Sequence, residues 1–194
     1  MKRQPLRVGF DLDGVLLYNP TRLLRPFIVG VKKIFFKARK GVFFVPRHKL
    51  EKIIWYVFHK SSLFINPGFD DIKRLVREKK IKAYLITGRY SFLQADLDKW
   101  LKKLEADKYF EQCFFNKSDQ QPTLFKEQIV RSLDLDYFIE DNWDIVAYLN
   151  SIFRKTKSKL KIFWVANFFD QTIAYPYKFP RLADALKQID SELS

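Results

Sequence analysis

Two carboxylates, Asp11 and Asp13, end a short apolar run that reads Val-Gly-Phe-Asp-Leu-Asp-Gly-Val over residues 8–15. Side chains alternate along an extended chain, so both carboxylates lean the same way from the end of a strand, and Gly14 lets the backbone turn away. Two close carboxylates repel each other and persist mostly where a cation or a shared proton offsets the repulsion. One could ligate Mg²⁺ and attack an electrophile, while the other could hold and transfer a proton. A solvated turn is the alternative, because Asp and Gly are common turn residues.

Three further groups of polar residues follow apolar runs or lie in helix-like stretches, and their order favours chemistry over a turn. Strand ends of this kind are where open α/β sheets place their active sites. Adjacent acids at the end of a strand are uncommon without a cation. The groups are Thr87-Gly88-Arg89 after Leu85-Ile86, then Lys126, then Glu140-Asp141-Asn142 after Phe138-Ile139.

With these four groups in this order, the chain resembles the haloacid dehalogenase-like (HAD) phosphohydrolases over roughly residues 6–175. The sequence Phe-Ile-Glu-Asp-Asn at 138–142, with Lys126 fourteen residues before Glu140, resembles more narrowly the cytosolic type-C 5′(3′)-deoxyribonucleotidase-like branch. The resemblance implies hydrolysis of a small phosphorylated substrate, with Mg²⁺ as cofactor.

In that reaction a carboxylate nucleophile divides one difficult step into two through an aspartyl-phosphate. The resemblance assigns the attack on phosphorus to Asp11. Asp13 would protonate the leaving oxygen and then activate the water that releases phosphate. Thr87 and the backbone N–H of Gly88 would bind phosphoryl oxygens, and Lys126 would balance the charge that develops as nucleophile and phosphoryl group meet.

The resemblance also implies a Mg²⁺ site and a substrate contact. Mg²⁺ needs hard oxygen ligands, and Asp11 by its carboxylate, Asp13 by its backbone carbonyl and Asp141 would supply them. Glu140 would bind the metal directly or lie beside it. Arg89 is the candidate for a further contact to the substrate.

Plainer interpretations stay open for several of these residues. Lys117 is an alternative to Lys126 for the lysine of the site. Lys126 could also be an ordinary solvated residue, as lysines on a helix face usually are. Arg89 could equally lie on the surface. Asp144 is a weaker metal candidate, since the helix dipole alone favours an acid at a helix start.

Strands alternate with helices along the chain, which predicts an α/β fold: a Rossmann-like three-layer sandwich with a mostly parallel sheet and right-handed crossovers. The expected strands cover 6–10, 81–86, 113–115, 137–139 and 161–165. The expected helices cover 69–80, 91–104 with Ser91 as cap, 122–133, 144–153 and 181–193.

An insertion between the first carboxylates and Thr87 predicts a second, smaller unit. Apolar residues at helical spacing mark one helix over 21–40 and another from about Leu50 to Phe58. We therefore expect an α/β core made of 1–18 and 67–194, with 19–66 as a small basic helical cap that resembles the caps of HAD enzymes.

Charge is unevenly distributed in this chain of 194 residues with a net charge of +14. The segment from Arg22 to Lys60 contains eleven Lys and Arg residues and one acid, Glu51. This segment fits an anionic partner, nucleic acid or an anionic membrane surface, but equally a solvated surface. The single cysteine, Cys113, is expected in a buried strand and fits a reducing compartment. Because no apolar run is long enough to span a bilayer, we expect a cytoplasmic protein.

Two functions from different classes follow. The first is a Mg²⁺-dependent phosphatase for a small phosphomonoester, with a nucleotide, which the narrower resemblance implies, as the leading substrate. Phe43, Phe44, Tyr18 and Tyr90 could stack on a base, although such aromatic residues more often lie in the core or at the rim of a site. The second is a basic protein that binds nucleic acid or an anionic membrane and keeps a vestigial HAD site. A phosphatase acting on nucleic-acid ends lies between them.

Overall fold

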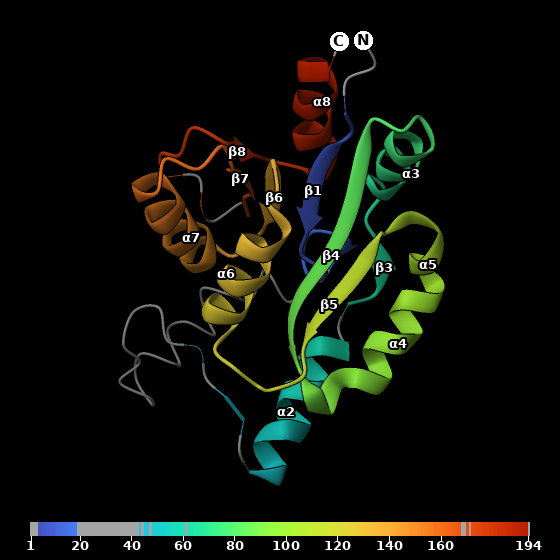
Figure 1. Cartoon of the computed structure of the whole chain (residues 1–194). Helices are drawn as coiled ribbons and strands as arrows, with labels where there is room; N and C mark the ends of the chain where they lie inside the picture. Colours follow the sequence, from blue (N-terminus) through green and yellow to red (C-terminus); the bar gives the residue numbers. More distant parts are fainter. Residues whose placement is uncertain are drawn as a thin grey trace.

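A parallel six-stranded sheet forms the centre of the protein (Figure 1), in the strand order β5-β4-β1-β6-β7-β8. The computed structural model describes residues 4–18, 43, 45–46, 48–60, 62–167, 170 and 172–193, without the side chains of residues 54 and 57–60. The strands are β1 (Leu6–Phe10), β4 (Ile81–Tyr90), β5 (Gln112–Asn116), β6 (Tyr137–Glu140), β7 (Lys161–Val165) and β8 (Lys178–Phe179). The predicted α/β class and mostly parallel sheet are confirmed.

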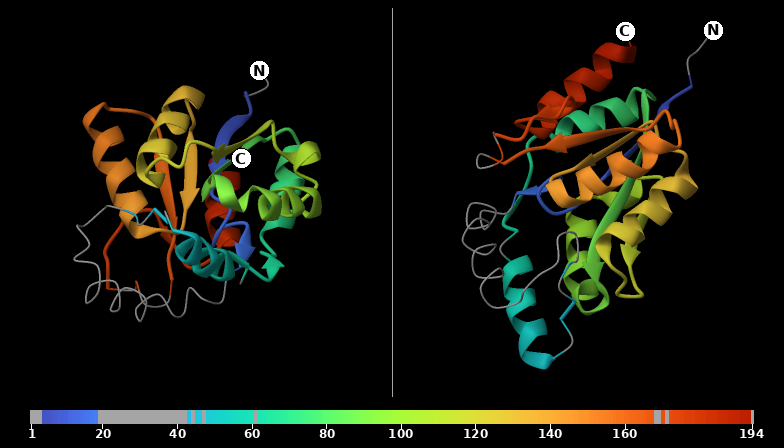
Figure 2. Two further views of the ribbon diagram at one scale, coloured as in Figure 1. Left: turned by 90° about the horizontal axis from the view of Figure 1, so that it is seen from below. Right: turned by 90° about the vertical axis from the view of Figure 1, so that its left-hand side faces the viewer.

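Helices cover both faces of this sheet, so the core is a three-layer sandwich (Figure 2). Alternate side chains of the strands point to opposite faces; Phe138 packs in one apolar cluster and Ile139 in the other. One face carries α3 (Phe69–Arg77), α4 (Gln94–Lys103), α5 (Ala106–Tyr109) and α8 (Leu182–Leu193); the other carries α6 (Pro122–Leu133) and α7 (Trp143–Lys155).

A second, two-stranded antiparallel sheet connects the core to the insertion. It pairs β2 (Leu17–Tyr18) with β3 (Phe64–Ile65). Between them lies α2 (Lys49–Lys60), beyond the carboxyl end of β1 in Figure 1. The helix predicted over 21–40 lies outside the described residues, and the division into core and cap stays a prediction. No helix in the described part of the chain has the length and apolarity to cross a membrane, and the cytoplasmic location also stays a prediction.

Local differences from the expected elements have identifiable causes. Ser91 does not cap a helix: its N–H and hydroxyl donate to Asp119 at 2.6 and 2.8 Å, and a short 3₁₀ turn, η2 (Ser91–Leu93), precedes α4. The helix that begins at Phe69 is shorter than predicted, because Lys79 adopts a positive φ of 57° soon after it ends. Cys113 is exposed rather than buried, since β5 is the edge strand of the sheet.

Candidate active site

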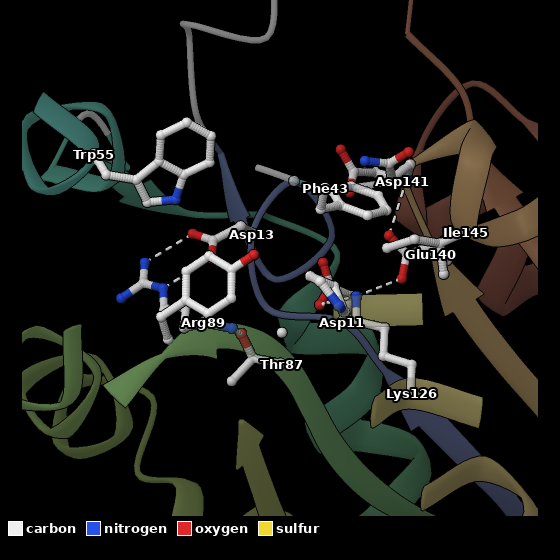
Figure 3. Close-up of a pocket in the computed structure, with 15 residues that line it drawn as sticks. Asp11, Asp13, Phe43, Trp55, Thr87, Arg89, Lys126, Glu140, Asp141 and Ile145 are labelled. Atoms are coloured by element: carbon white, nitrogen blue, oxygen red, sulfur yellow. Dashed lines mark hydrogen bonds and ion pairs between the residues drawn. The ribbon is translucent and has the colours of Figure 1, made fainter. Parts of the chain in front are cut away.

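The strand order brings the predicted functional residues to one edge of the sheet. β1 lies between β4 and β6, so the residues that end or follow these three strands meet there. They line a cavity of about 260 Å³ (Figure 3). Every predicted site residue is in its wall, namely Asp11, Asp13, Thr87, Gly88, Arg89, Lys126, Glu140 and Asp141.

Lys126 connects two of the carboxylates. It lies one turn into α6, is 2% exposed, and its Nζ is 2.7 Å from Asp11 Oδ1 and 2.6 Å from Glu140 Oε2. Burial disfavours the ammonium ion, but Asp11 and Glu140 outweigh burial and raise the pKa of Lys126 above its ordinary value. Lys117, the alternative from the sequence, is exposed and lies over the ring of Phe115. Lys126 is therefore the lysine of this site.

Asp11, Glu140 and Asp141 form a candidate metal centre. Their carboxylate oxygens lie within 4.8 Å of one another. Burial, followed by repulsion from Glu140, raises the pKa of Asp11 well above its ordinary value. Burial likewise raises the pKa of Glu140, whose Oε1 accepts the N–H of Asn142 at 3.0 Å.

This set of donors fits Mg²⁺, which prefers hard carboxylate oxygens. Among the described residues that line the cavity, four carboxylates face two cationic side chains, Lys126 and Arg89. A divalent cation would offset the excess of negative charge. Asp11, Asp141 and Glu140 are the side chains that would hold it.

Asp13 is held by Arg89. The Nε and one terminal nitrogen of the guanidinium donate to the two carboxylate oxygens of Asp13 at 2.8 and 2.7 Å. The other terminal nitrogen donates to Asp96 on α4 at 2.7 Å. Ser62, just before β3, donates its hydroxyl to Asp13 at 3.1 Å. Arg89 lines the cavity, but its guanidinium is buried and is directed at two carboxylates, Asp13 and Asp96.

Thr87 and Gly88 bring the backbone of β4 close to α6. The buried Thr87 Oγ1 accepts the N–H of Arg89 at 3.3 Å. A Cβ on Gly88 would lie 3.0 Å from Pro122 Cβ and 3.7 Å from Lys126 Cε. Glycine therefore lets β4 approach the start of α6 without a tight contact between a Cβ and Pro122.

Comparison with known proteins shows which solved structures share this fold. No protein-family model matches the chain, and no curated protein matches it. Solved structures do. A HAD-superfamily hydrolase from Ehrlichia chaffeensis is 14% identical with a TM-score of 0.53, and all of both chains is covered. The fold is that of the HAD-superfamily hydrolases.

Two further structures of this fold have phosphorylated ligands in their names. A predicted phosphoglycolate phosphatase from Haemophilus somnus has a TM-score of 0.58 at 13% identity, covering 96% of this chain and 98% of its own. A mutant of CbbY from Rhodobacter sphaeroides in complex with xylulose-1,5-bisphosphate has a TM-score of 0.53 at 13% identity, covering 92% and 95%. The narrower resemblance to the deoxyribonucleotidase-like branch stays a prediction.

Aromatic residues also line the cavity, and the sequence had pointed to only some of them. Trp55 of α2 lines the cavity on the side of Asp13, and Phe43, named only as one of several aromatic residues, lines it beside Asp141 (Figure 3). The side-chain amide of Gln121 accepts the N–H of Phe43 at 2.8 Å and donates to its carbonyl at 3.0 Å. The sequence pattern indicates whether such an aromatic residue lies on a helix or in a loop. It does not indicate whether the side chain lines a cavity or packs in the core.

Proposed function

We propose that this protein is a Mg²⁺-dependent phosphatase that hydrolyses a phosphomonoester through an aspartyl-phosphate intermediate. The observation that carries the proposal is the pairing of the buried Asp11 with Lys126 in the wall of an open cavity, with Glu140 and Asp141 within 4.8 Å. A buried carboxylate next to a fixed cation and two more carboxylates is costly to maintain for stability alone. It suits a site that binds a cation and a phosphoryl group.

In the first step an oxygen of Asp11 bonds to phosphorus and the bond from phosphorus to the leaving oxygen breaks. We assign the attack to Oδ2, because Oδ1 accepts the hydrogen bond from Lys126. Asp13 delivers a proton to the leaving oxygen. In the second step water bonds to phosphorus and gives its proton to Asp13, while the bond between Asp11 and phosphorus breaks and phosphate leaves.

The remaining groups bind the phosphoryl oxygens. The Thr87 hydroxyl and the N–H of Gly88 lie in the cavity wall, where they are suited to donate hydrogen bonds. Lys126 stays paired with Asp11 and Glu140 and balances the charge of the phosphoryl group as it approaches. Mg²⁺, when bound, supplies positive charge that lets the phosphate dianion approach the carboxylates.

A nucleotide is the leading substrate within this proposal. Phe43, Trp55 and Tyr90 line the cavity, and stacking of a base on an aromatic side chain contributes about 1–3 kcal/mol. Tyr18, also considered for this role, instead stacks on Phe64 with ring centroids 4.9 Å apart. Fold neighbours named for phosphoglycolate and a sugar bisphosphate support a phosphorylated substrate more generally.

The test is phosphate release from a panel of phosphomonoesters, nucleotides included, with Mg²⁺ or with chelator. Wild type is compared with Asp11→Asn and with Asp98→Asn, an exposed acid on α4 that serves as the matched control. We expect Mg²⁺-dependent release that Asp11→Asn abolishes and Asp98→Asn keeps. Release that survives Asp11→Asn would refute the assigned nucleophile.

The basic segment 22–60 motivates the second candidate, a nucleic-acid- or membrane-binding protein, and a phosphatase for nucleic-acid ends between the two. Only part of this segment is described, including the exposed Lys49 and Lys52 on α2. Binding through many phosphate contacts weakens steeply with salt, whereas turnover of a small monoester should change little. Steeply salt-dependent polyanion binding in a folded protein that releases no phosphate would favour this candidate over the phosphatase.

A further inference from the structure

We propose that Arg89 is a positioning residue, which fixes the carboxylate of the proposed acid–base residue Asp13, and that it is not a substrate contact. The inference rests on the proposed function. Two hydrogen bonds, at 2.8 and 2.7 Å, join the planar guanidinium to both oxygens of Asp13. Such bidentate, charge-assisted pairs define the relative orientation of the two groups as well as their distance. The plane of the Asp13 carboxylate is therefore set by Arg89.

Arg89 is itself anchored on the side of α4. Its remaining terminal nitrogen donates to Asp96 at 2.7 Å, and the guanidinium side chain is 1% exposed while that of Asp96 is 12% exposed. Arginine stays protonated in proteins, so its charge persists between these two carboxylates. To contact a substrate, the guanidinium would have to leave a buried ion pair, and separating such partners costs several kcal/mol.

Asp13 is also held from a second part of the chain. Ser62 donates its hydroxyl to the same oxygen, Oδ1, at 3.1 Å. Arg89 comes from β4 and Ser62 from the segment before β3, so two separate elements orient one carboxylate. Asp11, two residues earlier, depends instead on Lys126 from α6. The nucleophile and the acid–base residue thus have separate supports, and one support can be changed without directly altering the other.

Positioning and substrate contact predict different kinetics. A residue that binds substrate equally in ground and transition states changes KM and leaves kcat. A residue that aims Asp13 changes kcat, because a misplacement of about 1 Å can cost about 10²-fold. Its loss should also matter more for a leaving group that needs a proton, such as an alkoxide, than for p-nitrophenolate, which departs without one.

The experiment compares wild type, Arg89→Lys, Arg89→Ala and Asp96→Asn on p-nitrophenyl phosphate and on glycerol 2-phosphate, with Mg²⁺ present. Arg74→Lys is the matched control, because Arg74 also binds several carboxylates but lies on the surface away from the site. Release of the leaving group in a single turnover isolates the first step. We expect Arg89→Lys to lower its rate at saturating substrate by about 10²-fold on glycerol 2-phosphate and clearly less on p-nitrophenyl phosphate, and to leave the half-saturating substrate concentration within about twofold. Asp96→Asn should act in the same direction with a smaller loss.

Chemical rescue separates orientation from folding. Methylguanidinium added at millimolar concentration to Arg89→Ala should restore part of kcat, because it can refill the space between Asp13 and Asp96. Thermal melting identifies variants that do not fold; if Arg89→Ala is one of them, Arg89→Lys and Asp96→Asn carry the test.

A rise in KM with kcat unchanged would overturn the proposal in favour of a substrate contact. Equal losses of the single-turnover rate on both substrates would overturn it as well, because the first step is the one that depends on the leaving group, and so would absence of rescue in a folded Arg89→Ala. The absence of Mg²⁺-dependent phosphate release by the wild type would instead refute the proposed function, so the two failures are distinguishable.

Discussion

The indole N–H of Trp164 donates a hydrogen bond of 3.0 Å to the backbone carbonyl of Asp141. Trp164 lies on β7 opposite Glu140 of β6 and is fully buried. The ring of Trp143 packs on it with a centroid distance of 4.5 Å, and Lys178 Nζ lies 5.4 Å from its centroid. The segment that carries the candidate metal ligand Asp141 is thus held by the neighbouring strand.

Trp164→Phe keeps an aromatic ring but removes this donor together with part of the buried ring. Because groups that orient metal ligands typically influence metal affinity about 10- to 100-fold, we expect about a tenfold rise in the Mg²⁺ concentration needed for half-maximal phosphate release. The measurement is a Mg²⁺ titration, with Trp100→Phe on α4 as control. An unchanged Mg²⁺ requirement would show that the hydrogen bond does not orient Asp141.

Lys126→Met tests the cation between Asp11 and Glu140. Removing one partner of a buried ion pair leaves uncompensated charge, which costs about 3–5 kcal/mol. We expect a loss of this size in the free energy of unfolding with chelator, loss of phosphate release, and a larger stabilisation by Mg²⁺ than in wild type. Denaturant unfolding with and without Mg²⁺ measures the effect, and the exposed Lys117→Met should behave like wild type. Equal stabilisation by Mg²⁺ in Lys126→Met and in wild type would show that Lys126 does not influence metal binding.

The pH dependence of stability should differ between the metal-free protein and the protein with Mg²⁺. Burial and Glu140 raise the pKa of Asp11 in the metal-free fold, while the unfolded carboxyl keeps its ordinary pKa of about 3.9. Between these two pKa values the folded protein binds the extra proton, so with chelator its stability falls as pH rises through this window. Mg²⁺ binds the ionised carboxylates, so its stabilising effect should grow with pH over the same window.

Thermal melts at a series of pH values from about pH 4 upward, in chelator and in Mg²⁺, measure both trends. Asp11→Asn removes one of the two carboxyls whose pKa is raised, the other being Glu140, and should make the chelator curve less steep. A chelator curve that rises with pH across the window in wild type would contradict the raised pKa.

Trp55→Ala tests the aromatic wall contributed by α2. Base stacking of about 1–3 kcal/mol corresponds to a rise in KM of about tenfold for a nucleoside monophosphate, with little change for glycerol 2-phosphate. Steady-state kinetics on both substrates gives the comparison, and Trp100→Ala controls for loss of an indole elsewhere. An equal rise in KM for both substrates would argue against stacking on a base.

Much of the site followed from the sequence because a parallel sheet gathers residues by strand end. Asp11, Thr87 and Glu140 are far apart in sequence, yet the order β4-β1-β6 places them around one cavity. Strand ends are visible as apolar runs that stop at polar residues, and this signal is local. The sheet, the helices of the core and the grouping of the candidate site residues could be predicted from the sequence for this reason.

The hydrogen-bond partners of these residues could not be predicted from the sequence in the same way. The sequence suggested a substrate contact for Arg89, but it contains no sign that the guanidinium reaches Asp13 and Asp96, because both contacts depend on how β4, α4 and the loop after β1 pack. The prediction that Cys113 is buried was wrong for a similar reason. An apolar run predicts a strand, but the topology decides whether that strand lies at the edge of the sheet.

The antiparallel pairing of Leu17 with Ile65 and of Tyr18 with Phe64 brings the two ends of the insertion to adjacent points on the molecule. Paired strands lie about 4.8 Å apart, so a tight hairpin turn could connect them directly. We therefore expect that the segment between Tyr18 and Ser62 could be exchanged for another, in the sense used in protein engineering. Segments of different length could be grafted onto the same two strands, changing what reaches the cavity while Asp11, Lys126 and Arg89 stay in place.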